Sequence, residues 1–226
     1  MMEKVKNKIR DILDFLVLIF IYILVPQVIG MIFFKVFKLP ESTSVYLGNF
    51  FVLVIYFVMY KDKLLKNLKD YFSKVSNFSD SLKYWGIGFG IMIFSNIIIN
   101  VFILNNGGST NENLVRDSLK IYPIIGFLSI SVVAPFVEEM IFRFGLRKIT
   151  GKNKFFPLVS ALIFGFVHTI AGLQDGNFLE LLYIIPYGAL GYTFGLAYNK
   201  SDNIFSSVMA HMIHNTLVYT LIMMAQ

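Results

Sequence analysis

The sequence contains no cysteine among its 226 residues. It can therefore form no disulfide, offer no thiolate nucleophile and build no cysteine-based metal site. Charged residues are also scarce, at 15% of the chain, whereas hydrophobic residues make up 56% and aromatic residues 16%. Soluble domains usually carry about 25% charged residues. This composition indicates an integral membrane protein.

Seven apolar segments are long enough to cross a bilayer, because about 20 helical residues span a hydrocarbon core of about 30 Å. Backbone groups in lipid must be satisfied internally, and a β-barrel would show short segments of alternating hydrophobicity instead. We therefore predict an all-α fold, a polytopic membrane helical bundle of about seven transmembrane helices. The predicted spans are residues 15–34, 44–60, 84–104, 121–146, 155–172, 181–198 and 204–225.

Basic residues outnumber acidic ones, 20 to 14, and they cluster beside the apolar segments. This placement favours the lipid bilayer over nucleic acid as a partner. Outside the predicted spans, 15 Lys and Arg residues lie on the side of the N-terminus and 4 on the other side. The positive-inside rule thus predicts a multi-pass protein of the cell membrane with a cytoplasmic N-terminus. The first apolar run lacks a small-x-small cleavage site, so we expect a retained span rather than a signal peptide.

We expect a single integral-membrane domain over residues 1–226, in two parts. The polar, turn-forming residues 105–111 predict a linker between N-terminal spans (1–120), whose cores hold no charge, and catalytic core spans (121–226). Residues 61–83 alternate lysines with apolar residues, which predicts an amphipathic segment on the cytoplasmic surface. Glycines at 188, 191 and 195 predict close helix packing. We find no internal repeat of the kind that inverted-repeat transporters show.

Glu138, Glu139 and Arg143 interrupt the apolar segment 121–146. Ionisable groups in hydrocarbon cost at least a few kcal/mol each, so their presence suggests a functional site. On a helix Glu139 and Arg143 lie four residues apart on one face, whereas Glu138 is turned by about 100°. A salt bridge that only fixes helix packing explains Glu139 and Arg143 equally well. Glu138 has no such local partner, which makes it the stronger functional candidate.

All three histidines, His168, His211 and His214, lie inside predicted spans. Any one of them taken singly could be a hydrogen-bonded packing residue. However, at 1.5 Å per residue Glu138, His168 and His211 all lie about 12–16 Å from the same predicted membrane edge. A shared depth on three helices predicts one site. Its groups suit hydrolysis by a carboxylate base acting on water, and no Ser or Thr is positioned as a nucleophile.

Helical spacing adds two residues to this site, because Phe164 precedes His168 by four residues and Asn215 follows His211 by four. The motifs Glu-Glu-x-x-x-Arg, Phe-x-x-x-His and His-x-x-x-Asn, in this order on three helices, resemble the CPBP family of intramembrane endopeptidases. That family includes CAAX prenyl proteases of the Rce1 type and bacterial Abi proteins of bacteriocin processing or immunity. The resemblance covers about residues 120–226.

The resemblance implies a role for each matched residue. Glu138 would activate water together with His168, while His211 and Asn215 would form the oxyanion hole. Glu139 and Arg143 would contact the catalytic residues without touching the substrate, and Phe164 would line the site beside His168. His214 does not belong to the family pattern and is left out of the catalytic set.

We therefore expect an intramembrane endopeptidase of the CAAX/Abi type that opens towards the cytoplasm. It would hydrolyse membrane-associated, lipidated or leader-bearing peptides by glutamate-activated water. The sequence names neither the substrate nor the oligomeric state. One alternative is a bacteriocin self-immunity or regulatory membrane protein that binds without cleaving. Another is an ion-coupled transporter, which would need polar residues that the first three spans nearly lack.

We expect no cofactor, although zinc is an alternative. Glu138, His168 and His211 would form a His₂Glu set of the kind that holds catalytic zinc with one open position. Against zinc, the sequence has no His-Glu-x-x-His motif and no cysteine ligand, and all three ligands would come from different helices. The amide of Asn215 also suits oxyanion donation better than metal ligation.

Overall fold

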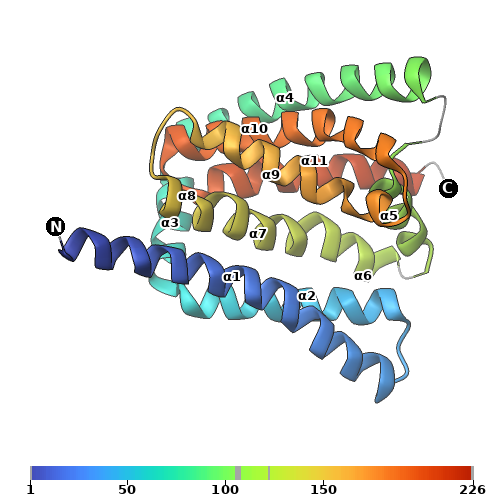
Figure 1. The fold of residues 1–226 in the computed structure, drawn as a ribbon, viewed down its shortest axis with the longest axis horizontal. Helices are drawn as coiled ribbons and strands as arrows, with labels where there is room; N and C mark the ends of the chain where they lie inside the picture. The colour runs from blue at the N-terminus through green and yellow to red at the C-terminus, as the bar shows by residue number, and fades with distance from the viewer. Residues whose placement is uncertain (1, 105–107, 122, 225–226) are drawn as a thin grey trace.

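The computed structural model describes residues 2–104, 108–121 and 123–224, which are almost entirely helical and include no strand (Figure 1). The all-α prediction is therefore confirmed. In chain order the elements are α1 (Met2–Lys35), α2 (Glu41–Met59), α3 (Lys61–Ser73), α4 (Val75–Ile97), η1 (Ile98–Ile103), α5 (Thr110–Ile121), α6 (Pro123–Leu128), η2 (Ser129–Val133), α7 (Ala134–Glu139), η3 (Met140–Gly145), α8 (Leu146–Thr150), α9 (Phe156–Gln174), η4 (Phe178–Tyr183), α10 (Ile184–Ser201) and α11 (Ile204–Met224).

The protein is a multi-pass membrane protein. Among the described residues, five helical runs are long and apolar enough to cross a membrane, and a sixth is added if the bent pair α2 and α3 counts as one span. The predicted number of about seven is thus approximate. The remaining predicted span corresponds to α11, which has 21 residues. Its polar residues His211, His214 and Asn215 lower its mean hydropathy, which is why length and composition alone do not mark it as a span.

The helices form layers that place one of these spans in the middle (Figure 1). Helices α1 and α2 pack on each other at one side, and α4 covers the other side against α10. Between them lies the central run, residues 123–150, in which α7 packs on α2 and α11 while η3 and α8 contact α9. The central run has the largest buried share of the five spans. Its charged residues therefore face protein rather than lipid.

The central run is not one regular α-helix. It alternates α-helical turns with two π-helical stretches, η2 and η3, on either side of α7. Short π-helical insertions are frequent at functional sites because they re-aim side chains. Here they flank the short helix that carries both glutamates.

The predicted surface segment 61–83 is correct only in its first half. The chain bends by 91° between α2 and α3, and α3 buries Leu64 and Tyr71 while its lysines stay exposed. The helix ends at Ser73, and residues 75–83 already belong to α4. Of the predicted linker 105–111, residues 105–107 lie outside the described residues, and Thr110 begins α5.

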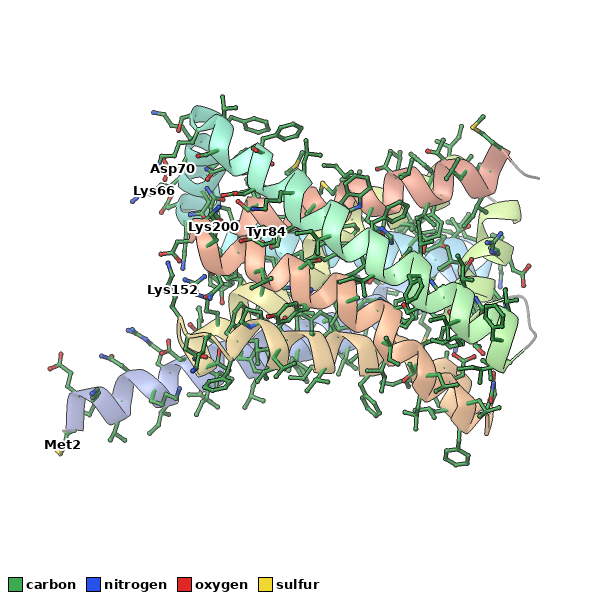
Figure 2. All side chains as sticks on the ribbon, turned by 90° about the horizontal axis from the view of Figure 1, so that it is seen from above. Met2, Lys66, Asp70, Tyr84, Lys152 and Lys200 are labelled. Atoms are coloured by element: carbon green, nitrogen blue, oxygen red, sulfur yellow. The ribbon has the colours of Figure 1, made fainter. Side chains whose placement is uncertain are left out.

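One end of the bundle gathers the basic tracts, and we call it the basic end. Figure 2 shows Met2, Lys66, Lys152 and Lys200 at this end. Ion pairs join its elements: Lys148 Nζ lies 2.7 Å from Asp14 Oδ2, and Lys200 Nζ lies 2.7 Å from Asp80 Oδ1. The tracts that the charge count assigned to one side thus lie at one end. Which compartment that end faces stays a prediction.

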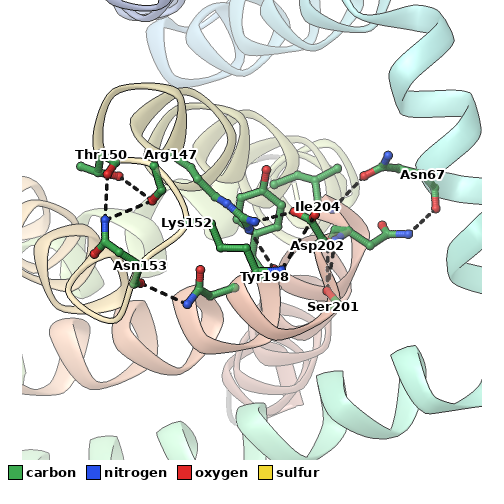
Figure 3. Close-up of polar contacts among 12 residues, drawn as sticks. Asn67, Arg147, Thr150, Lys152, Asn153, Tyr198, Ser201, Asp202 and Ile204 are labelled. Carbon is green, nitrogen blue, oxygen red and sulfur yellow. Dashed lines mark hydrogen bonds and ion pairs between the residues drawn. The ribbon is translucent and has the colours of Figure 1, made fainter.

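The start of α11 is fixed at the basic end by polar contacts (Figure 3). Asn67 of α3 accepts from the backbone N–H of Ile204 at 3.1 Å and from the side chain of Asn203 at 2.7 Å. Next to this contact, Arg147 pairs with Asp202 at 2.5 Å. These contacts fix the position of α11 along the bundle axis, and with it the level of His211 and Asn215 relative to the central run.

Helices α9 and α10 approach each other closely, as the glycines predicted. A Cβ atom at Gly191 would lie 3.1 Å from Cδ1 of Phe164, and one at Gly195 would lie 3.0 Å from Cα of Pro157. A larger residue at either position would push the two helices apart. The close packing brings Phe164 and the backbone of Gly191 next to the charged residues of the central run.

Candidate active site

Glu138, near the end of α7, lies between His168 of α9 and His211 of α11. Its Oε2 atom is 3.9 Å from the Nε2 atom of each histidine. The side chains are 16% exposed for Glu138, 16% for His168 and 5% for His211, and Glu138 Oε2 is buried without a hydrogen-bond partner. The structure therefore brings these three predicted catalytic residues together from three helices.

The second nitrogen of each imidazole is held by an acceptor. His168 Nδ1 lies 2.8 Å from the carbonyl oxygen of Phe164, and His211 Nδ1 lies 2.9 Å from Glu139 Oε1. A carbonyl and an ionised carboxylate only accept, so Nδ1 carries the hydrogen in both rings. In the neutral rings both Nε2 atoms then present lone pairs towards Glu138. Three acceptors facing one point need a hydrogen-bond donor or a cation between them.

Glu139 and Arg143 form the buried pair that their spacing predicted. Arg143 NH1 lies 3.0 Å from Glu139 Oε1, and both side chains are fully buried. Arg143 also donates to the carbonyl oxygen of Gly191 at 2.9 Å and lies 4.6 Å from the ring centroid of Phe164. The guanidinium is thus held by one carboxylate, one carbonyl and one aromatic face, while its Nε and NH1 atoms are buried without a hydrogen-bond partner.

The bond from His211 to Glu139 is a contact that the sequence reasoning missed. Glu139 Oε1 serves Arg143 and His211 at once, so the buried ion pair also orients an imidazole that faces Glu138. The two residues stand 72 positions apart in the chain. No helical spacing relates them, so only the packing of α11 against α7 reveals the contact.

Asn215 and Phe164 both line the site. The Asn215 side-chain nitrogen donates to the carbonyl oxygen of Ile130 in η2 at 2.8 Å, so the π-helical stretch supplies a backbone oxygen that positions the amide. The Phe164 ring is buried and lies 4.3 Å from the His168 ring and 5.7 Å from the His211 ring, measured between centroids. It fills the space behind both imidazoles, as a wall of the site would.

A cavity of about 200 Å³ adjoins these residues. Glu138 contributes to its lining, together with Tyr46 near the start of α2 and Asn111 in α5. Both of these residues come from the end of the bundle opposite to the basic end (Figure 1). The cavity therefore extends away from the basic end, in contrast to our expectation of a site that opens towards it. Depth along a helix gives the level of a residue, but it does not tell which way the cavity runs.

The donor set suits a metal chemically, but its spacing does not. Metal-bound histidines usually donate their other N–H to a carboxylate or a carbonyl, as His168 and His211 do here. Two zinc ligands at about 2.1 Å in tetrahedral geometry lie about 3.4 Å apart, whereas the oxygen-to-nitrogen distances here are 3.9 Å. In the described part of the chain no three His, Cys, Asp or Glu side chains could hold a metal ion as placed.

A family model matches the part of the chain that carries this site. Residues 120–217 match the family model described as Type II CAAX prenyl endopeptidase Rce1-like. The predicted family is thereby confirmed over this part of the chain. All the predicted site residues, from Glu138 to Asn215, lie inside this Rce1-like segment.

Curated relatives point in the same direction. The chain is 33% identical over 144 residues to a Bacillus subtilis (strain 168) protein named "Putative membrane peptidase YdiL", covering 59% of this chain and 54% of that protein. It is 26% identical over 134 residues to the UPF0177 protein YvdC of Lactococcus lactis, covering 57% and 48%. The chain thus spans about half the length of these two relatives. No solved structure matches. The matching family model and the first relative are thus both named as membrane or prenyl peptidases.

Proposed function

We propose that this protein is an intramembrane endopeptidase in which Glu138 activates a water molecule. The observation that carries the proposal is the convergence of Glu138 Oε2 with two Nε2 atoms, each at 3.9 Å, inside the helical bundle. A separation of 3.9 Å is too long for a direct hydrogen bond and suits a bridging water. Water is also the simplest species that can donate to acceptors on both sides.

The proposed reaction begins with this water donating to Glu138 Oε2 and to His168 Nε2. Glu138 takes the proton as general base while the water oxygen attacks the peptide carbonyl, and the proton then goes to the leaving amine. The buried Oε2 atom of Glu138 suits this role, because no protein donor occupies the place of the water. His168 is held for it by its bond to the carbonyl oxygen of Phe164.

The oxyanion that forms needs donors, and we assign these to His211 and Asn215. His211 lies between two carboxylates, Glu138 and Glu139, and in a doubly protonated ring its Nε2–H would donate to the oxyanion. An amide nitrogen carries two hydrogens. Asn215 uses one on Ile130 and would donate the other into the cavity. Each oxyanion donor of this kind contributes roughly 10²–10³-fold to the rate.

The substrates that we propose are membrane-associated, lipidated or leader-bearing peptides. The cavity is enclosed by helices of a membrane-spanning bundle, so the scissile bond must reach the site from the bilayer or its surface. We place the protein in the cell membrane with a cytoplasmic N-terminus, on the basis of the charge asymmetry. This orientation and the absence of a cofactor are parts of the proposal.

A second candidate function is binding without cleavage, as in a bacteriocin self-immunity or regulatory protein. It would use the same cavity, which Glu138, His168 and His211 line, and hold its ligand without turnover. Binding does not need a general base, so this candidate tolerates loss of the Glu138 carboxylate. An ion-coupled transporter is a weaker candidate, since Glu139 and Arg143 of the central run pair with each other inside the protein.

The deciding experiment uses purified protein in liposomes with a library of quenched fluorogenic peptides. We expect the wild type to cleave a subset of them and Glu138→Gln to lose at least about 10²-fold of that rate. The matched control is Glu41→Gln at the exposed start of α2, which should keep the wild-type rate. If Glu138→Gln retains more than about a tenth of the activity, the assignment of the base is wrong.

A further inference from the structure

A second cavity of about 150 Å³ adjoins the candidate active site. The two cavities share three lining residues, Tyr187, His214 and Tyr219. The remaining polar lining of the second cavity comes from α4 and the region at the start of α5, namely Asn96, Ser109 and Glu112. An occupant of the second cavity would therefore lie next to a peptide bound at Glu138.

His214 is the polar group that the described contacts leave unsatisfied at this junction. It is 8% exposed, and its Nδ1 atom is buried without a hydrogen-bond partner. Its ring contacts Phe89 edge-on at 5.8 Å between centroids. A buried nitrogen without a partner is costly in a folded protein. In this one, the nitrogen belongs to a residue that lines both cavities.

The face of α11 explains why His214 serves both cavities. His211, Asn215 and Tyr219 follow one another at four-residue spacing and line the first cavity. His214 and Val218 form the neighbouring stripe and line the second. The two stripes lie side by side on one helix, so a chain bound along the first stripe passes within reach of His214.

Tyr187 forms the wall that the two cavities share. Its ring lies 4.8 Å from the His168 ring between centroids. Its hydroxyl group bonds to the Ser109 hydroxyl group at 2.7 Å and accepts from the Asn111 amide at 3.3 Å. The hydroxyl group is therefore occupied by the start of α5, whereas His214 Nδ1 in the same wall is buried without a hydrogen-bond partner.

The residues that line the second cavity indicate which chemical group it can bind. Glu112 disfavours a carboxylate, and its own charge is paired with Arg116 at 2.5 Å, so an added cation gains little. A volume of about 150 Å³ admits a small side chain. We infer that the second cavity is a specificity subsite for a neutral, hydrogen-bonding side chain of the peptide substrate, such as Ser, Thr, Asn or Gln, with His214 as its partner.

The inference rests on the proposed function, and a binding assay separates the two. The first measurement uses the Glu138→Gln protein in nanodiscs and the affinity of fluorescent peptides that differ at one position, where Asn is compared with Leu, Glu and Lys. The second compares cleavage of the same peptides by wild-type protein. Both are repeated with His214→Phe, which fills the ring's place without a polar nitrogen. Thr216→Val, on the exposed outer face of α11, is the matched control.

We expect His214→Phe to lower the ratio of Asn-peptide to Leu-peptide affinity about tenfold at one peptide position, the effect of losing one hydrogen bond. Thr216→Val should leave the ratio unchanged. An unchanged ratio in His214→Phe at every position overturns the subsite, and so does a preference for Glu or Lys over Asn. If the peptides bind with the expected ratio but the wild type cleaves none of them, the subsite stands and the proposed hydrolysis fails.

Discussion

Two substitutions at adjacent positions, Glu138→Gln and Glu139→Gln, should affect different properties of the protein. Both convert a carboxylate on the same short helix into a carboxamide, so the two changes are matched in size and position. Glu138 has no hydrogen-bond partner on Oε2, whereas Glu139 holds Arg143 at 3.0 Å and His211 at 2.9 Å. The first change should therefore remove activity and spare stability, and the second should lower stability.

The structure sets the magnitude of the Glu139 effect. Glu139 and Arg143 are both fully buried, and breaking such a pair by removing one partner costs about 3–5 kcal/mol. Glutamine keeps an oxygen that can accept from Arg143 or His211, so we expect the lower end, about 3 kcal/mol. At roughly 2–4 °C per kcal/mol this lowers Tm by about 6–12 °C. Glu138→Gln should stay within about 1 kcal/mol of the wild type.

The assay is thermal or denaturant unfolding of the purified variants in detergent, followed by near-UV circular dichroism, beside the peptidase rate. A third variant, Glu139→Gln with Arg143→Met, removes the stranded charge. It should recover part of the loss, with a coupling energy of about 0.5–3 kcal/mol. If the two single variants unfold within about 1 kcal/mol of each other, the ion pair does not carry the stability assigned to it.

Three further predictions follow from other contacts. Thr110→Val removes one of the two hydrogen bonds that dock the start of α5 on buried Glu180; it should cost about 1 kcal/mol and raise hydrogen exchange in α5, and unchanged exchange would contradict the docking. Lys152→Cys should react with an impermeant thiol reagent only from the cytoplasmic side, and Asp175→Cys only from outside. Lys152 is chosen over its neighbour Gly151, because the φ angle of 75° at Gly151 disfavours any residue with a side chain. Chelation by o-phenanthroline should leave the peptidase rate unchanged, and loss that Zn²⁺ restores would reject the metal-free mechanism.

The sequence by itself determined the class of the fold and predicted which residues of separate helices the structure brings together around Glu138. Apolar segments of about 20 residues can satisfy their backbone only as helices in lipid, so composition and hydropathy fix an all-α membrane bundle. The pairing of Glu139 with Arg143 is a local property of a helix, and its spacing of four residues predicts it. The level at which His168 and His211 meet Glu138 follows from the fixed rise of a helix.

Only the tertiary structure decided what those residues contact. The bond from Glu139 to His211 and the bond from Asn215 to the carbonyl of Ile130 join residues 72 and 85 positions apart, and no periodicity of a single helix encodes them. The direction of the cavity is likewise set by how α2 and α5 pack over the site. A pattern along one helix gives the face and the height of a side chain, whereas the packing of several helices determines its partner and its access to substrate.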